Sequence, residues 1–367
     1  MRVAVVTTSY PLTADSFAGH FVASEAKTLR AEGHEVIVCA PGAPHDRMID
    51  SIRVVTLGGE RLFVSPGALP NLRAHPALAL DALSFVLRAK RWLHQNGPFE
   101  KIQAHWLIPS GWPIANLTGP TRRSTEVECV CHGSDVRLLE AFPGIFQRRV
   151  IAQLARPEVR LRCVSHDLKS RLLHIAPTLA AQLTVKPCAI DVEHAPPREQ
   201  ARAELQIPPN EKLVLIVARL IPGKRVDIAL SALADFADSG HHSQIRAVVI
   251  GDGPQMLQLS RNYPLARFLG AQPRSQTLRW MAAADVLLCA STEEGAPTVV
   301  REARALGVPV VCAAAGDVLS WAQRDQGIHV FDSPESIAAI VSEVVSGSPS
   351  ARVATACDRH LSPLVRE

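Results

Sequence analysis

The stretch STEEGAPTVVREA, residues 291–303, is the most informative part of this chain. The apolar run 284–290 that leads into it predicts a strand, its Gly and Pro residues predict a tight turn, and a helix is expected from Thr298 onward. Glu294 would then stand at the carboxyl end of a strand, and Glu302 a turn or so into the following helix. Ligands of open parallel sheets bind outside such strand ends, where the amides of a helix start favour an anion such as a diphosphate. Ionised carboxylates only accept hydrogen bonds, so the pair suits the hydroxyls of a sugar or a ribose.

Each glutamate alone has an ordinary explanation. A carboxylate in the first turns of a helix is usually solvated and suits the positive end of the helix dipole. The pair is more informative because the segments around it fit the same strand–turn–helix pattern. The next predicted strand, 307–313, also ends in a loop with a glycine, Gly316.

Short Val/Ile/Leu runs alternate with amphipathic stretches along the whole chain, which predicts βαβ units and parallel sheets. At 367 residues the chain exceeds the size at which one core usually stops growing, so two domains are expected. The Pro-containing segment 186–198 is the expected hinge, since the strand pattern restarts after it. The expected strands are 3–7, 35–40, 52–56, 102–105, 127–131 and 161–164, then 212–218, 245–250, 268–269, 286–289, 308–312 and 329–331.

The region 284–311 resembles the E-x7-E region of the retaining glycosyltransferases of family 4, which have the GT-B fold. The matching residues are Ala284, Asp285, Ser291, Glu294, Gly295, Pro297, Glu302, Ala303, Ala305, Gly307, Pro309, Val310 and Val311. The resemblance covers nearly the whole chain and implies an α/β protein with two Rossmann-like doubly wound domains facing a central cleft. It implies an acceptor-side domain at 1–187, a nucleotide-sugar donor domain at 188–345, and a segment, 346–367, that returns to the first domain.

The same resemblance assigns roles to the donor loop. Glu294 would orient the donor sugar and Glu302 would hold the ribose hydroxyls. The remaining expected donor-binding residues of this loop are Gly295, Ala296, Pro297 and Thr298.

Arg219 and Lys224 follow the predicted strand 212–218. Two cations at the carboxyl end of a strand are placed to neutralise a diphosphate leaving group, with arginine able to grip it through two hydrogen bonds. A basic surface loop is the alternative. The family pattern "g-R-l-x-x-x-K-G" matches at both cations and implies that they bind the donor diphosphate and act in catalysis.

Further matches lie in turns that follow other predicted strands. Gly251 and Gly253 fit the family's G-x-G-p turn, which helps to shape the nucleotide pocket, although such a turn alone is weak support for phosphate binding. His132 and Asp135 match the H-G-x-D motif, which implies that the histidine lies beside the donor sugar and that the aspartate supports the site. A lone histidine in this place is more often structural. Gly19 resembles the glycine of the family's first loop, which allows close approach to the diphosphate.

The chain also departs from the family pattern in three places, the first being Arg225, which stands where the family has Gly after Lys224. The hinge motif p-N-G-v-D reads PCAID at 187–191, and the loop 315–320 reads AGDVLS without the family's Glu, so that Leu319 and Ser320 stand near its expected place. Reduced activity is therefore one open alternative. No D-x-D, G-x-G-x-x-G or P-loop motif is present, so we expect no metal and no cofactor, and a nucleotide-diphosphate sugar as substrate.

Charge is unevenly distributed. Residues 1–185 hold 21 Lys or Arg against 15 Asp or Glu, a balance of +6, whereas 186–367 hold 18 against 20, a balance of −2. The excess suits peripheral contact with an anionic membrane or a lipid-diphosphate acceptor, and a solvated helical face is the alternative. Nucleic acid is not expected, because no aromatic residues are interleaved with the basic ones. The basic cluster consists of Arg148, Arg149, Arg156, Arg160, Arg162, Lys169 and Arg171.

The expected location is the cytoplasm, peripheral at the inner face of the membrane. The eight cysteines are scattered without a C-x-x-C pair, which indicates buried thiols in a reducing compartment. The apolar run at the start, 3–6, is too short for a signal peptide and predicts a buried first strand.

The sequence thus predicts a retaining, metal-independent hexosyltransferase-type glycosyltransferase. It would transfer a sugar from a nucleotide-diphosphate sugar to a saccharide or lipid-linked acceptor hydroxyl in cell-surface polysaccharide or glycolipid biosynthesis. Two alternatives stay open: a non-catalytic nucleotide-sugar-binding protein and a nucleotide-sugar epimerase of GT-B fold.

Overall fold

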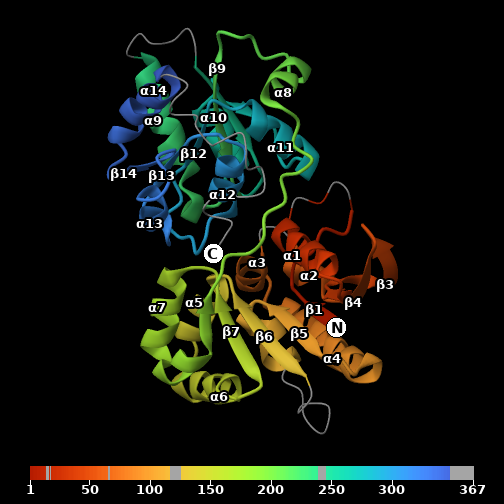
Figure 1. Ribbon diagram of the computed structural model, residues 1–367. Coiled ribbons are helices and arrows are strands. Elements are labelled where there is room, and N and C mark those ends of the chain that lie inside the picture. The colour runs from red at the N-terminus through yellow and green to blue at the C-terminus, as the bar shows by residue number, and fades with distance from the viewer. Residues whose placement is uncertain (14–15, 17, 65–66, 116–124, 239–244, 348–367) are drawn as a thin grey trace. The chain divides into compact units, whose positions relative to one another are not determined.

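The computed structural model describes residues 1–13, 16, 18–64, 67–115, 125–238 and 245–347 (Figure 1). The chain forms two compact units, one from Met1–Leu12 and Ala18–Ala189 and the other from Ile190 onward. The division falls inside the expected hinge. Most of the segment 346–367, for which a return to the first domain is predicted, lies outside the described residues.

The first unit contains a sheet in the order β3-β4-β2-β1-β5-β6-β7-β8, parallel except for β3, which pairs antiparallel with β4. The direction of strand addition reverses at β1, as in doubly wound folds. The strands are β1 (Arg2–Val6), β2 (Glu35–Ala40), β3 (Gly42–Ile49), β4 (Ile52–Gly58), β5 (Lys101–His105), β6 (Glu126–Cys131), β7 (Val159–Cys163) and β8 (Leu183–Val185).

Helices cover both faces of this sheet. Val3 and Val5 pack with Val22 and Ala26 of α1, and the intervening residues of β1, which point to the opposite face, are equally buried. Continuous burial of this kind is typical of parallel strands. The helical segments are α1 (His20–Ala31), α2 (Glu60–Phe63), α3 (Ala68–Ala74), η1 (Pro76–Leu78), α4 (Ala79–Asn96), η2 (Leu107–Ile114), α5 (Ser134–Glu140), α6 (Gly144–Leu154), α7 (His166–Ile175) and η4 (Pro177–Gln182).

The second unit has an all-parallel sheet in the order β11-β10-β9-β12-β13-β14. In chain order this is 3-2-1-4-5-6, the Rossmann arrangement, with the reversal between β9 and β12. The strands are β9 (Lys212–Val217), β10 (Ile245–Ile250), β11 (Arg267–Phe268), β12 (Val286–Cys289), β13 (Val310–Ala313) and β14 (Ile328–Phe331).

Alternate residues of the central strands of this sheet enter separate cores. Leu213 and Leu215 of β9 face one core, and Val214 and Ile216 face the other. Residues of α8, α11, α12 and α13 complete the first core, and those of α9, α10 and α14 complete the second. The helical segments are α8 (Arg198–Glu204), η5 (Pro222–Lys224), α9 (Val226–Asp238), α10 (Met256–Asn262), α11 (Arg274–Ala283), α12 (Thr298–Ala305), α13 (Val318–Ala322) and α14 (Ser336–Ser346).

The predicted α/β class and doubly wound pattern are confirmed. Each strand expected from the sequence is present with ends that differ by at most three residues. The sequence did not reveal β3 or β8. β3 is a polar, mostly exposed edge strand, and β8 has only three residues, so neither produces a buried apolar run.

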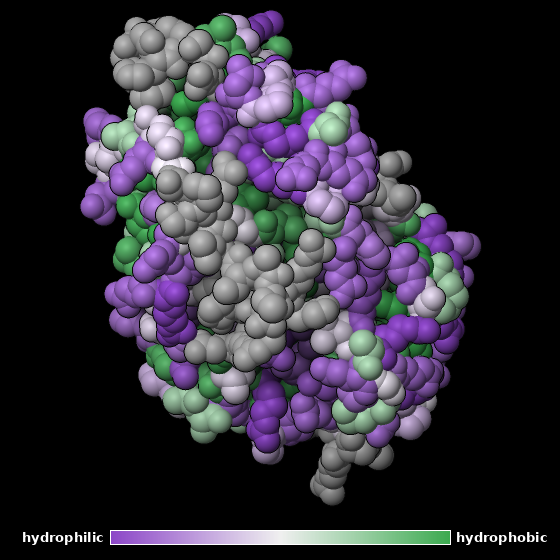
Figure 2. All heavy atoms as spheres, turned by 45° about the horizontal axis from the view of Figure 1, so that its top comes forward, coloured by the Kyte–Doolittle hydropathy of each residue, from purple (hydrophilic) through white to green (hydrophobic). Residues whose placement is uncertain are grey.

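No helix within the described parts of the chain has both the length and the apolar character needed to cross a bilayer. On the face shown in Figure 2, hydrophilic residues predominate and hydrophobic residues form separate groups among them. None of the seven cysteines in the described ranges belongs to a disulfide.

Asp285 joins α8 to the sheet of the second unit. It is 2% exposed and precedes β12. Its carboxylate accepts hydrogen bonds at 3.0 Å from both Arg198 and Arg202 of α8, and at 2.9 Å from the backbone N–H of Leu213. A buried carboxylate with such partners is costly to remove, because the guanidinium groups lose their counter-charge.

We expect Asp285→Asn to lower the free energy of unfolding of the second unit by about 3 kcal/mol, the lower end for a buried ion pair because Arg198 is partly exposed. The measurement is denaturant unfolding followed by circular dichroism. Asp332→Asn, at an exposed position, is the control and should change stability by less than about 0.5 kcal/mol. Equal losses in the two variants would contradict this role for Asp285.

Candidate functional site

A cavity of about 230 Å³ lies at the point where the strand order of the second unit reverses. The loops that follow β9 and β12 form much of its wall, which is where doubly wound sheets bind ligands. It brings together several residues that the sequence assigned to one site. Its polar wall includes Arg219, Lys224, Ser291, Glu294 and Thr298, and Pro297 also lines it.

Lys224 and Glu294 form an ion pair across this cavity. Lys224 ends the short η5 turn after β9, whereas Glu294 lies in the turn between β12 and α12. Both side chains are about one-fifth exposed. A second contact joins the same two loops, since the Ser291 hydroxyl donates a hydrogen bond to the Gly223 carbonyl at 3.3 Å. The structure thus places a cation and a carboxylate, predicted separately, in direct contact.

The turn between Glu294 and α12 packs against neighbouring loops. Gly295 and Ala296 do not line the cavity, and Ala296 packs against the hydrophobic core instead. The carbonyl of Gly295 lies against Gly316, where a Cβ atom would come within 2.0 Å of that oxygen. Gly316 is therefore required at this contact, and its loop fixes the position of the turn.

Glu302 lies outside the set of residues that line the cavity. It is 6% exposed on α12 and pairs with Arg274 at 2.7 Å. Arg274, at the start of α11, also donates a hydrogen bond to the carbonyl of Asp191 at 2.9 Å. Arg274 could not be identified from the sequence, because a single arginine at a helix start has no distinguishing pattern.

Gly251 and Gly253 shape the loop that carries Arg219. A Cβ atom on Gly251 would lie 1.8 Å from the carbonyl oxygen of Ala218, and its φ of +137° is unfavourable for other residues. Gly253 lies against Leu220, whose backbone N–H donates a hydrogen bond to the Asp252 carbonyl at 2.9 Å. Glycine is needed at both positions because the backbone there packs closely against the residues on either side of Arg219.

In the first unit, Asp135 connects the loops that follow β5 and β6. Its carboxylate accepts hydrogen bonds from the backbone N–H groups of Leu107, His132, Gly133 and Val136, at 2.7 to 3.1 Å. Burial raises the pKa of the Asp135 carboxyl, and these four donors oppose the shift. The contacts fit the supporting position expected from the H-G-x-D motif.

His132 lies among aromatic rings in this unit. Its ring centroid is 4.7 Å from that of Trp106 and 5.0 Å from that of Phe21. Its Nε2 is 3.1 Å from Nδ1 of His105. Burial lowers the pKa of His132 well below its usual value, so the ring is neutral near pH 7. Trp106 has a φ of +69°, a strained conformation for an aromatic residue.

Gly19 precedes α1 in the same unit. A Cβ atom there would come within 2.6 Å of the backbone nitrogen of Tyr10. The glycine thus permits the loop after β1 to pass close to the start of α1. This contact is a structural reason for Gly19 that is independent of any ligand.

The basic cluster is not a single exposed surface. Arg162 is a strand residue, only 3% exposed, and pairs with Glu25 at 2.7 Å and Glu128 at 3.6 Å. Arg171 pairs with Glu140 at 2.6 Å. Arg162 was therefore wrongly included, because a strand with alternating arginines was interpreted as part of a basic face.

Two family models match adjoining parts of the chain. Residues 18–194 match the model described as Glycosyltransferase Family 4, and residues 197–356 match the model described as Glycosyl transferases group 1. The chain belongs to the family 4 type of GT-B glycosyltransferases. The predicted family is thereby confirmed, and the two Rossmann-like units are those of the GT-B fold.

This glycosyltransferase is similar to two curated proteins over most of their length. TuaC of Bacillus subtilis (strain 168), named as a glycosyltransferase of teichuronic acid biosynthesis, is 26% identical over 94% of this chain and 88% of its own. The GDP-mannose-dependent alpha-mannosyltransferase of Mycobacterium tuberculosis (strain CDC 1551 / Oshkosh) is 28% identical over 86% of this chain and 80% of its own.

The fold is also that of solved structures. Sucrose-phosphate synthase from Thermosynechococcus elongatus superposes with a TM-score of 0.75 at 19% identity, covering 96% of this chain and 91% of that chain. At this identity the likeness concerns the fold alone.

We expect Gly251→Ala to destabilise the second unit by several kcal/mol, because the new Cβ would collide with the Ala218 carbonyl and the loop must shift. Gly270→Ala is a matched control: its φ of +69° is also positive, but nothing lies within 4 Å of the added atom. Urea unfolding of the two variants separates the collision from backbone strain. Equal losses would show that close packing against the Arg219 loop is unimportant.

Proposed function

We propose that this glycosyltransferase transfers a sugar from a nucleotide-diphosphate sugar to an acceptor hydroxyl, with retention of anomeric configuration and without a metal ion at the diphosphate. The observation that carries the proposal is the cavity at the β9/β12 reversal. There Arg219 and Lys224 lie in one loop and Glu294 in the other.

The cations of the cavity suit a departing diphosphate. Breaking the bond to the sugar builds negative charge on the diphosphate, and fixed cations stabilise that charge where little water competes. Lys224 would exchange its contact with Glu294 for one with the diphosphate. Arg219 would add a second cation from the same loop, so a metal ion is not needed for this task.

Once Lys224 binds the diphosphate, the Glu294 carboxylate is available to bind the sugar. Glu294 can accept hydrogen bonds from the hydroxyls of the transferred sugar and so hold it for reaction. Glu302 would accept from the ribose, provided that the nucleotide takes over from Arg274. The turn residues Gly295, Ala296, Pro297 and Thr298 would supply backbone groups at the start of α12.

Residues of the first unit complete the proposal. His132 would contact the donor sugar as a neutral imidazole, since its burial disfavours the charged form. Asp135 would hold the His132 backbone and the loop after β5 in place. Gly19, Gly251 and Gly253 would act through close backbone approach to the donor.

The relatives suggest the process but not the sugar. One is named for teichuronic acid biosynthesis and the other for dependence on GDP-mannose, which supports a role in cell-surface polysaccharide or glycolipid synthesis. A thermal-shift screen of UDP- and GDP-sugars would identify the donor. Epimerisation of a nucleotide sugar without an acceptor, or binding without turnover, would instead favour the two alternative functions.

Arg219→Ala and Lys224→Ala should each lower the transfer rate about 10²–10³-fold, the usual effect of removing one fixed group that stabilises a developing anion. The assay follows release of the nucleoside diphosphate with the donor from the screen and with excess chelator present throughout. Wild-type turnover under chelator tests metal independence in the same experiment. Arg261→Ala, an exposed cation on α10, is the control and should keep its activity. Near-normal turnover in both cavity variants would refute the assignment.

We also propose peripheral contact of the first unit with an anionic membrane through the start of α6. Arg148 and Arg149 are exposed there, and Ile145 and Phe146 beside them are 65% and 51% exposed. Apolar side chains next to cations suit the boundary between lipid headgroups and acyl chains. This arrangement keeps part of the predicted basic cluster, although Arg162 and Arg171 are engaged elsewhere.

The double variant Arg148→Glu/Arg149→Glu should bind anionic vesicles at least about tenfold more weakly at low salt, because each basic residue near such a surface contributes about 1 kcal/mol. Co-sedimentation with anionic and neutral liposomes at low and physiological salt measures this. Charge reversal at Arg261 and Arg324, both exposed in the second unit, is the control. Equal binding of the wild type to anionic and neutral vesicles would exclude an electrostatic contact.

A further inference from the structure

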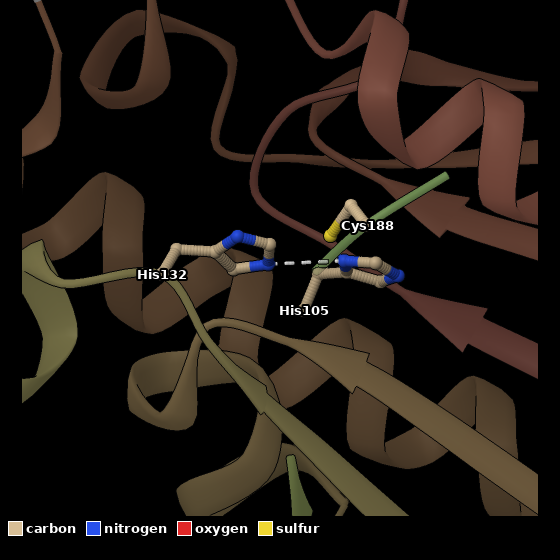
Figure 3. Close-up of side chains that lie close together, drawn as sticks. All are labelled: His105, His132 and Cys188. Atoms are coloured by element: carbon tan, nitrogen blue, oxygen red, sulfur yellow. Dashed lines mark hydrogen bonds between the residues drawn. The ribbon is translucent and has the colours of Figure 1, made fainter. Parts of the chain in front are cut away.

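Two imidazoles and a thiol converge inside the first unit (Figure 3). His105 ends β5, His132 follows β6, and Cys188 follows β8. Their donor atoms all lie within 4.8 Å of one another. Figure 3 shows the His132 ring directed at the His105 ring, with the Cys188 sulfur beside them. The proposed function uses only one member of this cluster, His132.

Hydrogen bonds fix which nitrogen of His105 carries its proton. The amide nitrogen of Gln103 donates to Glu128 at 3.0 Å, which leaves the Gln103 oxygen facing Nε2 of His105 at 3.2 Å. An amide oxygen only accepts, so Nε2 of His105 carries the hydrogen. Nδ1 of His105 therefore presents its lone pair to the cluster. Metal-binding histidines are commonly oriented in this way through their second nitrogen.

Cys188 is held by its neighbour. The backbone N–H of Ala189 donates to the Glu25 carboxylate at 2.6 Å, and the other oxygen of Glu25 pairs with Arg162. Arg162 is close enough to Cys188 for their charges to interact. Glu25 and Glu128 both pair with Arg162, so two carboxylates offset its positive charge near the cluster.

The donor set and its spacing suit zinc. Zn²⁺ binds histidine nitrogen at about 2.0–2.1 Å and cysteine sulfur at about 2.3 Å, which sets tetrahedral ligand atoms roughly 3.3–3.7 Å apart. The two imidazole nitrogens, at 3.1 Å, are already near this spacing. No pair of donors in the cluster exceeds 4.8 Å, so closure on an ion requires a shift of at most about 1 Å.

We propose that His105, His132 and Cys188 bind Zn²⁺ with an open fourth position, and that the bound ion inhibits sugar transfer by engaging Nε2 of His132. Binding releases the thiol proton of Cys188 and moves the hydrogen of His132 from Nε2 to Nδ1, so one proton leaves for each ion bound. The inhibitory part rests on the proposed function of His132, whereas the metal site does not. Cys188 occupies the place where the family pattern has Asn, so the departure at the hinge supplies the soft ligand.

The binding test uses the whole chain after chelator treatment and dialysis. Titration with Zn²⁺ against a chromophoric chelator should give one tight site per chain, and Co²⁺ should produce a thiolate-to-metal charge-transfer band. Cys188→Ala should abolish the band and weaken zinc binding at least about 100-fold. Cys39→Ala removes another buried thiol of the same unit and should leave both readouts unchanged. Gln103→Leu should weaken binding about 10–100-fold through the orientation of His105.

Cys188→Asn covers the case in which the alanine variant folds poorly, since asparagine is the residue that the family pattern has there. Equal zinc affinity in the wild type and Cys188→Asn, or no cobalt band in the wild type, would overturn the site. Stoichiometric zinc should inhibit transfer by the wild type but not by Cys188→Asn, each compared with its own rate under chelator. A cobalt band together with no transfer by the metal-free wild type under chelator would refute the proposed function and leave the metal site standing. Zinc binding without inhibition would overturn the regulatory part.

Discussion

The pairing of β9 with β12 is the constraint on which the candidate site depends. Val286 and Leu287 lie beside Val214 and Leu215 in parallel register, although a long stretch of chain separates the two strands. Because both strands run in the same direction, their following loops emerge at the same edge of the sheet. Lys224 and Glu294, 70 residues apart in sequence, meet there. The glycines packed behind these loops set how closely the loops can approach.

Several buried charges, in both units, are paired with charges of the opposite sign. Asp285 holds two arginines, and Arg162 is shared by two carboxylates. Such networks add little stability compared with apolar packing, but breaking one is costly, so they fix one arrangement of the elements that carry them. Asp135 has the same effect with backbone donors, since it ties together the loops that carry Trp106 and His132.

The sequence predicted the architecture well because the strands of parallel sheets are continuous apolar runs. β3 was not predicted because residues such as Pro44, His45 and Asp46 are polar or exposed at the edge of the sheet and form no apolar run. The strand-end loops were also predictable, since turn residues mark where each strand stops. The contact between Lys224 and Glu294 was not itself predicted, and the roles of both residues stay predictions.

Pairings between distant side chains could not be read from the sequence. Nothing in the sequence distinguishes Arg274 from other arginines, so the partner of Glu302 appears only in three dimensions. Arg162 looked like a surface cation for the same reason: alternation along a strand does not tell which face meets a buried carboxylate. The convergence of Cys188 with two histidines likewise depends on strand order, which places the ends of β5, β6 and β8 near one edge of the sheet.

The ion pairs of the second unit bear on which ligand the site can accept. Glu294 is held by Lys224, and Glu302 by Arg274, so each predicted acceptor is already neutralised by a cation. A free sugar offers hydroxyls to the carboxylates but no negative charge to the cations, whereas inorganic phosphate offers negative charge to the cations but adds charge beside the carboxylates. A ligand that replaces the partner of only one member of an ion pair leaves the other member partly buried without a partner, which is unfavourable. A nucleotide-diphosphate sugar carries anionic oxygens and hydroxyls in one molecule, so it can replace both partners at once. The pairs would therefore favour the intact donor over its fragments, which is the selectivity that the proposed transfer requires.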